Sequence, residues 1–108
     1  MESVDMSRIE AAARLLAPVI RRTPLLASRV LSERTGAEVW LKCENLQRTG
    51  SFKPRGAYNR IANLPQEARE RGVVAASAGN HAQGVAWSAA ALGLTSTVFM
   101  PIGRRCRN

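Results

Sequence analysis

Apolar and polar residues along the chain follow two periods, one typical of helices and one typical of strands. The helical spacing recurs in five stretches: residues 9–18, where Pro18 ends the helix, and residues 27–33, 57–64, 67–71 and 81–92. Ser7 and Glu10 have the form of a capping box, which predicts that the first helix begins at Ser7. Gly36 is suited to close the second helix, and residues 22–25 read as an extended connector because the residue before a proline avoids the helical region.

Three shorter stretches have the character of strands. Residues 38–44 alternate between apolar and polar side chains, residues 73–76 are wholly apolar, and residues 96–101 form a third strand candidate. A short, wholly apolar run is typical of a strand buried on both faces of a parallel sheet. Because strands and helices alternate, we expect one α/β domain in which the three strands form an open parallel or mixed sheet with helices packed on it.

Composition and cysteine usage narrow the class of protein. With 45% hydrophobic and 22% charged residues in 108 positions, the chain reads as a soluble globular protein. No signal-type apolar core follows Met1 and no apolar stretch is long enough to span a bilayer, so we expect a cytoplasmic protein without a membrane partner. Cys43, Cys106 and the single histidine, His81, lack the spacing of a zinc site, and we expect no bound metal.

The net charge of +8 raises the question of a nucleic-acid partner. Most of the arginines are scattered, and only Arg104, Arg105 and Arg107 form a cluster. No aromatic residues are interleaved with the basic ones, as they are in many proteins that bind single strands. We therefore expect a solvated basic surface, or a fragment of a protein whose remainder is more acidic, rather than nucleic-acid binding.

Two turns that lead from a strand into a helix carry the candidate chemistry. They comprise residues 51–56 and 77–84, and ligands of open α/β sheets bind at such carboxyl ends of strands. Lys53 in the first turn is a plausible nucleophile toward a carbonyl group, and the helix start in the second turn favours an anion. Either feature alone is weak, because a lysine at a helix start is usually solvated and Ser-Ala-Gly-Asn can be a simple helix cap.

Four segments in order give a much more specific signal. Thr49-Gly50-Ser51-Phe52-Lys53-Pro54-Arg55-Gly56-Ala57 resembles the lysine motif of the threonine/serine dehydratases, which are pyridoxal-phosphate enzymes related to the tryptophan synthase β subunit. Residues 77–84 are similar to the asparagine loop of that family, and residues 22–25 and 41–47 match its opening. The resemblance covers residues 22–101 and implies an incomplete sheet of the tryptophan synthase β-like fold.

The resemblance also implies a reaction and roles for individual residues. The expected cofactor is pyridoxal 5′-phosphate, and the expected reaction is the β-elimination that converts threonine, or serine as a second substrate, to a keto acid and ammonia; threonine gives 2-oxobutanoate. Such a lyase would act in isoleucine biosynthesis or in amino-acid catabolism. The implied roles are Lys53 as Schiff-base lysine and then base, Phe52 beside the cofactor ring, Asn80 at the 3′ oxygen of the cofactor, and Ser77, Gly79, Asn80 and His81 at the substrate carboxylate.

Position 78 distinguishes between relatives within this resemblance. Serine racemases of the group carry a serine there that acts as acid and base on the opposite face of the cofactor, whereas this chain has Ala78. An alanine side chain has no proton to transfer. The resemblance therefore favours a dehydratase over a racemase.

The sequence also departs from the family pattern. The phosphate of the cofactor is normally held by a glycine-rich loop, but no two of the eight glycines are adjacent, and no residue matches the family's contact to the pyridine nitrogen. The resemblance ends at Pro101, and we expect residues 102–108 to be a tail that does not match the family. We expect residues 1–108 to be a truncated N-terminal fragment of a dehydratase catalytic domain, inactive alone, with exposed apolar patches that promote self-association. A non-catalytic small α/β binding module and a basic nucleic-acid-associated protein remain as alternatives.

Overall fold

The computed structural model describes residues 3–102. The basic cluster of Arg104, Arg105 and Arg107, together with Cys106, lies outside the described residues. The elements are α1 (Met6–Leu16), β1 (Leu25–Ala27), α2 (Arg29–Thr35), β2 (Trp40–Lys42), the 3-10 helices η1 (Glu44–Leu46) and η2 (Arg48–Gly50), α3 (Lys53–Ala62), α4 (Gln66–Arg71), β3 (Val73–Ala76), α5 (Asn80–Ala91) and β4 (Ser96–Phe99). None of the described helices has the length and apolar character needed to cross a membrane.

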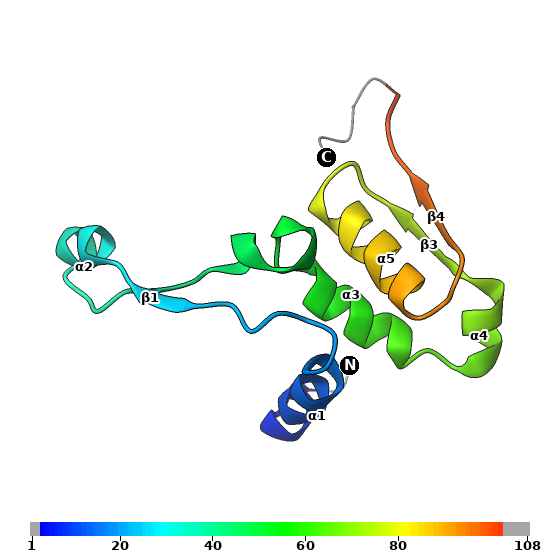
Figure 1. Ribbon diagram of the computed structural model, residues 1–108, viewed down its shortest axis with the longest axis horizontal. Coiled ribbons are helices and arrows are strands. Elements are labelled where there is room, and N and C mark those ends of the chain that lie inside the picture. Colours follow the sequence, from blue (N-terminus) through cyan, green and yellow to red (C-terminus); the bar gives the residue numbers. More distant parts are fainter. Residues whose placement is uncertain (1–2, 103–108) are drawn as a thin grey trace.

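The larger part of the fold, called the body here, consists of α3, α5, β3 and β4. β3 and β4 pair in parallel, from Val73 opposite Ser96 to Ala76 opposite Phe99, as the βαβ pattern predicts. α5 connects the two strands and packs between them and α3 (Figure 1). Three buried side chains from α3 and α5 form the core: Ala57, Ile61 and Val85. The α/β fold class is confirmed.

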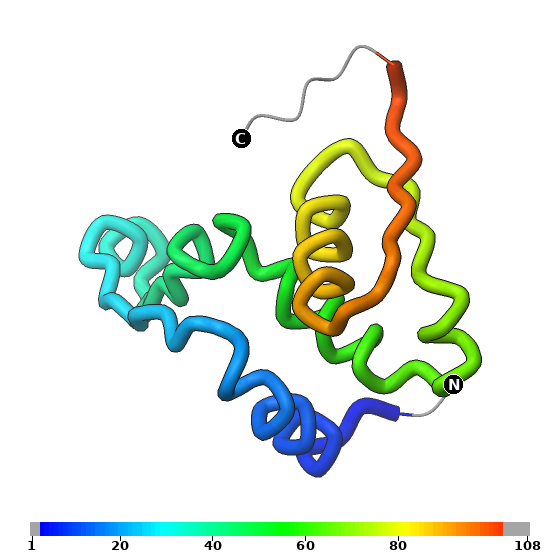
Figure 2. The backbone as a smooth tube through the Cα atoms, turned by 45° about the vertical axis from the view of Figure 1, so that its right-hand side comes forward, coloured from blue at the N-terminus to red at the C-terminus, as the bar shows by residue number. Residues whose placement is uncertain are grey.

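A second part, called the arm here, consists of β1, α2 and β2 and projects away from the body (Figure 1). β1 and β2 pair antiparallel with each other, so the described strands form two separate two-stranded sheets. The expectation that the strand near residue 40 joins the other two in one core was therefore wrong. The radius of gyration, 16.5 Å, exceeds the ~13 Å of a compact domain of this length because the arm lies apart from the core (Figure 2).

The sheet of the body is covered on one face only. Val73 and Ala75 lie against the core, whereas Val74 is 71% exposed and Phe99 is 64% exposed. The wholly apolar run 73–76 suggested a strand buried on both faces, and that expectation was wrong for this chain because no described element covers the second face. Large apolar side chains are thus exposed on this face of the sheet.

Local capping signals account for the start of α1 and for both ends of α2. Gly36 closes α2 in the left-handed conformation with φ of 69°, as its position predicts. The N-cap of α1, however, is Asp5 and not Ser7, because the Asp5 carboxylate accepts a hydrogen bond from the Arg8 amide at 3.0 Å. The Ser7 hydroxyl instead donates to the same carboxylate at 2.7 Å.

Candidate active site

Lys53 is the first residue of α3, and the loop before it holds its backbone. The side chain of Ser51 is buried and its Oγ accepts a hydrogen bond from the Lys53 amide at 3.4 Å. Pro54, in the first turn of the helix, is fully buried. The Lys53 side chain is half-buried, and its Nζ lies 5.0 Å from the centroid of the Phe52 ring, which is 59% exposed. Two of the three residues expected at the cofactor, Phe52 and Lys53, thus lie side by side on an accessible surface.

The chain enters this loop through a strained residue. Thr49 has φ of 63°, a left-handed conformation that a β-branched residue rarely adopts, and it is followed by Gly50 with φ of 73°. The Thr49 hydroxyl is buried without a hydrogen-bond partner among the described residues. Such strain persists only where the surrounding structure enforces it, and it is common next to functional sites.

The asparagine loop forms the beginning of α5. The Ser77 amide donates to the Phe99 carbonyl at 3.0 Å, and the Ser77 Oγ accepts from the Gly79 amide at 3.3 Å. Gly79 is the N-cap of α5 and supplies no side chain to cap the helix. Asn80 and His81 are exposed in the first turn, where helix amides have no partner within the helix. This helix start therefore presents free N–H groups and the positive end of the helix dipole to an anion.

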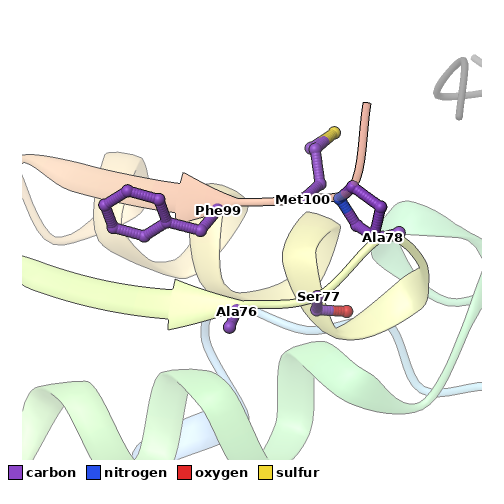
Figure 3. Close-up of a pocket in the computed structure, with 6 residues that line it drawn as sticks. Ala76, Ser77, Ala78, Phe99 and Met100 are labelled. Carbon is purple, nitrogen blue, oxygen red and sulfur yellow. The ribbon is translucent and has the colours of Figure 1, made fainter. Parts of the chain in front are cut away.

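The surface beside this loop is hollowed on two sides. One hollow, of about 570 Å³, lies at the carboxyl ends of β3 and β4 and is lined by Ala76, Ser77, Ala78, Phe99, Met100 and Pro101 (Figure 3). In Figure 3 the Ser77 hydroxyl and the Ala78 methyl come from the turn that follows β3. His81 lines a different hollow, of about 290 Å³, between α3, β3 and α5. Ser77, Gly79, Asn80 and His81 thus share one turn, but Ser77 and His81 line separate hollows.

Close packing of two helices joins the lysine loop to the asparagine loop. α5 lies along α3, with the rings of Tyr58 and Trp87 6.1 Å apart between the two helices. Gly84 in α5 lies directly against the main chain of Lys53, and a Cβ built on Gly84 would be 2.9 Å from the Lys53 Cβ. Lys53 and Asn80 make no hydrogen bond to each other among the described residues. The relation between the two loops therefore depends on helix packing.

The two opening segments form a clamp that sequence reasoning missed. Glu44 accepts two hydrogen bonds from the Arg55 guanidinium, at 2.7 and 2.8 Å, and one from the Thr23 hydroxyl at 2.5 Å. The buried Gln47 exchanges two hydrogen bonds with the backbone of Arg21, at 2.8 and 2.7 Å. Each residue of the clamp lies in one of the four segments that resemble the family, except Arg21, which directly precedes one of them. Which of these polar side chains bond to each other cannot be predicted from one sequence.

The clamp has a clear electrostatic signature. The Arg55 guanidinium lowers the pKa of Glu44 from 4.5 to about 2, against the opposing effect of burial, and the Thr23 hydroxyl assists. The carboxylate, by the same pairing, raises the pKa of Arg55. Because Arg55 is in the first turn of α3, two residues after Lys53, the clamp ties the segments before β1 and after β2 to the helix that begins with the lysine.

Comparison with known proteins agrees with this arrangement. The family model described as "Pyridoxal-phosphate dependent enzyme" matches residues 16–105. The L-threonine ammonia-lyase of Thermotoga maritima is 59% identical over 98 residues, which are 91% of this chain and 24% of that protein. The L-threonine dehydratase catabolic TdcB of Staphylococcus aureus is 54% identical over 99 residues, 91% of this chain and 29% of that protein. The chain thus spans about a quarter of the length of these curated relatives.

Solved structures give the same picture of the fold. The processed form of threonine deaminase isoform 2 from Solanum lycopersicum superimposes with a TM-score of 0.72 at 37% identity, over 95% of this chain and 30% of that chain. The serine racemase of Dictyostelium discoideum superimposes with a TM-score of 0.85 at 37% identity, over 94% of this chain and 34% of that chain. Both a deaminase and a racemase therefore share the arrangement of helices and strands found here.

Proposed function

Because the chain belongs to the family of pyridoxal-phosphate dependent enzymes, we propose that it is the part of a threonine dehydratase that carries the cofactor lysine and the carboxylate-binding loop. One observation carries the proposal: Lys53 begins a helix, and α5, whose uncapped N-terminus follows β3, packs directly against it. An amine beside an anion-binding helix start suits an amino-acid substrate, because its carboxylate and its reacting carbon lie close together.

The side chains present fit the ring of pyridoxal phosphate and the substrate rather than the cofactor's phosphate. Lys53 would hold the cofactor through its aldehyde carbon, with Phe52 against the ring and the Asn80 amide at the 3′ oxygen. The chain has no adjacent glycines of the kind that cradle a phosphate. When bound, the cofactor supplies an electron sink for the bonds at the α-carbon of an amino acid.

The residues of this chain would then divide the work on threonine. The backbone N–H groups of Asn80 and His81 would hold the carboxylate at the start of α5. Ser77 and Gly79 would lie beside it. Once the amino group of threonine has displaced Lys53 from the cofactor, the free Lys53 Nζ would take the proton from the α-carbon, and the β-hydroxyl would leave as water. Uptake of one water molecule would then release the nitrogen as ammonia. Threonine would finally give 2-oxobutanoate and ammonia, and serine, which has the same β-hydroxyl, would be a second substrate. This reaction would supply isoleucine biosynthesis or serve amino-acid catabolism.

Ala78 supports dehydration over racemisation. Racemisation requires an acid on the face of the cofactor opposite the lysine, and the methyl group of Ala78 carries no exchangeable proton. Ala78 lines the hollow at the ends of β3 and β4 beside Ser77 (Figure 3).

Chemical trapping tests the proposal, because the chain has only two lysines, Lys42 and Lys53. The chain is incubated with pyridoxal phosphate, an amine condenses with the aldehyde and releases water, and borohydride reduces the C=N bond to a stable amine. Peptide mapping should find the adduct on Lys53. Lys42 is the internal control, since its Nζ already donates to the Thr23 carbonyl at 2.7 Å. An adduct mainly on Lys42 would contradict the proposal.

We expect no threonine turnover by the 108-residue chain alone above the level of a Lys53→Ala control. Without a phosphate cradle the cofactor ring is not held in position, and small misplacements of reacting atoms cost about a hundredfold in rate. The assay measures 2-oxobutanoate with excess pyridoxal phosphate and threonine. Turnover well above the control would show that the chain, alone or assembled, builds a complete site.

We also propose that the chain associates with further copies of itself. Large apolar side chains are exposed on both parts of the molecule, including Val74 and Phe99 on the sheet and Leu26 and Trp40 on the arm. Large apolar side chains exposed in this number favour association with another apolar surface. Light scattering should report a mass above that of one chain, and a monomer that binds no hydrophobic dye would contradict this.

A further inference from the structure

The contact between α5 and the start of α3 is closer than any side chain would allow. A Cβ at position 84 would lie 2.9 Å from the Lys53 Cβ, 3.1 Å from its carbonyl carbon and 3.3 Å from its carbonyl oxygen. Carbon atoms in proteins pack at about 3.5–4.0 Å. All three atoms belong to the main chain or to the root of the side chain, so no rotation of the lysine can relieve the overlap.

We infer that Gly84 is a positioning residue for Lys53, an inference that rests on the proposed function. Lys53 projects from the first residue of α3, so its Cβ and carbonyl define where the amine can reach. Gly84 is buried against these atoms and fixes the start of α3 relative to α5. Because α5 also presents Asn80 and the free amides, this contact fixes how closely the main chain of Lys53 approaches the helix that carries the carboxylate site.

The loop on the other side of Lys53 leaves the contact little freedom to relax. Thr49 and Gly50 already have positive φ values, and the Ser51 Oγ holds the Lys53 amide. Pro54, fully buried, follows the lysine. A methyl group at position 84 must therefore shift the helix start as a unit, and the amine moves with it.

Gly56 offers a matched control. It lies in α3, three residues after Lys53, and a Cβ built there would meet no atom within 4 Å. Alanine is a better helix former than glycine, so helix propensity alone predicts that Gly56→Ala and Gly84→Ala both stabilise the fold. The contact with Lys53 predicts the opposite sign at position 84 only.

The first experiment measures the adduct formed by pyridoxal phosphate and borohydride on each lysine, with helix content followed by circular dichroism. In Gly84→Ala we expect helix content to be kept, labelling of Lys53 to fall at least fivefold, and labelling of Lys42 to stay as in the parent chain. In Gly56→Ala both lysines should label as in the parent chain. Equal labelling of Lys53 in the two variants would overturn the inference.

The second experiment is a double-mutant cycle on unfolding, which needs no cofactor. Gly84→Ala should lower the urea midpoint of the parent chain more than that of a Lys53→Gly chain, where the 2.9 Å overlap with the Lys53 Cβ is gone and only the carbonyl atoms at 3.1 and 3.3 Å remain. An equal shift in both backgrounds would refute the contact. If Gly84→Ala alone unfolds the chain, recovery of helix content in the double variant supports the inference, and failure to recover contradicts it. If the parent chain forms no adduct on Lys53, the proposed function fails, and the cycle still decides the role of Gly84.

Discussion

The body and the arm reach their structures by different means. In the body, apolar side chains from α3 and α5 are buried together, and β3 and β4 close against them. In the arm as the structure describes it, no residue of β1, α2 or β2 is buried, and the conformation depends on local hydrogen bonds such as that from the Val39 amide to the Ser32 hydroxyl at 2.9 Å. The body is thus stabilised by a buried core. The arm is held by local hydrogen bonds and leaves its apolar side chains exposed to solvent.

The clamp connects the two regions, whereas the lysine and the asparagine of the candidate active site lie in the body. Glu44 and Gln47 fasten the ends of the arm to Thr23, Arg21 and α3. Lys53, Asn80 and Gly84 all lie on α3 or α5. Neighbouring segments that match the family therefore have different roles. Some carry the candidate reacting groups, and others fix the arm to the body.

The largest expected contrast is between a core residue and an exposed residue of the arm. Ile61 is 4% exposed, and Ile61→Ala should lower the free energy of unfolding by about 3 kcal/mol. Leu26 is 54% exposed, and Leu26→Ala should change the free energy of unfolding by less than about 0.5 kcal/mol. Urea unfolding followed by circular dichroism measures both. Similar losses for the two variants would mean that the arm is buried in solution.

The next effect is on the clamp. Glu44→Gln removes the charge that faces Arg55 and should lower the free energy of unfolding by about 2 kcal/mol. Glu33→Gln is the matched control in the arm, because the Arg29–Glu33 pair is exposed and its N–O distance is 3.5 Å. In the same urea titration, Glu33→Gln should lower the free energy of unfolding by less than about 0.5 kcal/mol. A loss at Glu44 no larger than at Glu33 would contradict the clamp.

The clamp also predicts the acid sensitivity of the fold. The pKa of Glu44 is about 2 in the folded chain against 4.5 ordinarily, so the unfolded chain binds more protons between these values. The stabilisation from Glu44 is fully present above about pH 4.5 and is lost as the pH falls toward about 2. The loss should be about 2 kcal/mol after allowance for solvent screening.

The measurement is the urea midpoint as a function of pH, with Glu44→Gln as control. Between about pH 5 and about pH 3, the urea midpoint of Glu44→Gln should change less with pH than the midpoint of the parent chain. Identical slopes would show that other carboxylates, and not Glu44, govern the acid response.

The smallest expected effect compares one serine from each region. The Ser88 hydroxyl in α5 is buried without a partner among the described residues, so Ser88→Ala should raise the free energy of unfolding by about 1 kcal/mol. Ser32→Ala in α2 removes the acceptor of the Val39 amide and should lower it by about 1 kcal/mol. Thermal unfolding can resolve the two signs. Destabilisation by Ser88→Ala would indicate a bonded hydroxyl.

Several features could be predicted from local pattern because local forces decide them. The β3–α5–β4 unit follows from two apolar runs around a small-residue helix, and Gly36 closes α2 as a glycine at that position should. The exposure of Val74 could not be predicted, because burial depends on what covers the second face of the sheet. The choice of Asp5 over Ser7 as N-cap was decided by competition between two nearby polar side chains.

The sequence by itself determined the α/β class, most helix and strand positions, and the two loops that carry Lys53 and Asn80, because periodicity, capping and motif spacing are properties of contiguous residues. Only the tertiary structure decided that β2 pairs with β1 apart from the other strands, that Glu44 joins Thr23 to Arg55, and that Gly84 touches Lys53. Each of these contacts links residues well separated in sequence. Such pairings depend on the global packing of helices and strands, which no local pattern encodes.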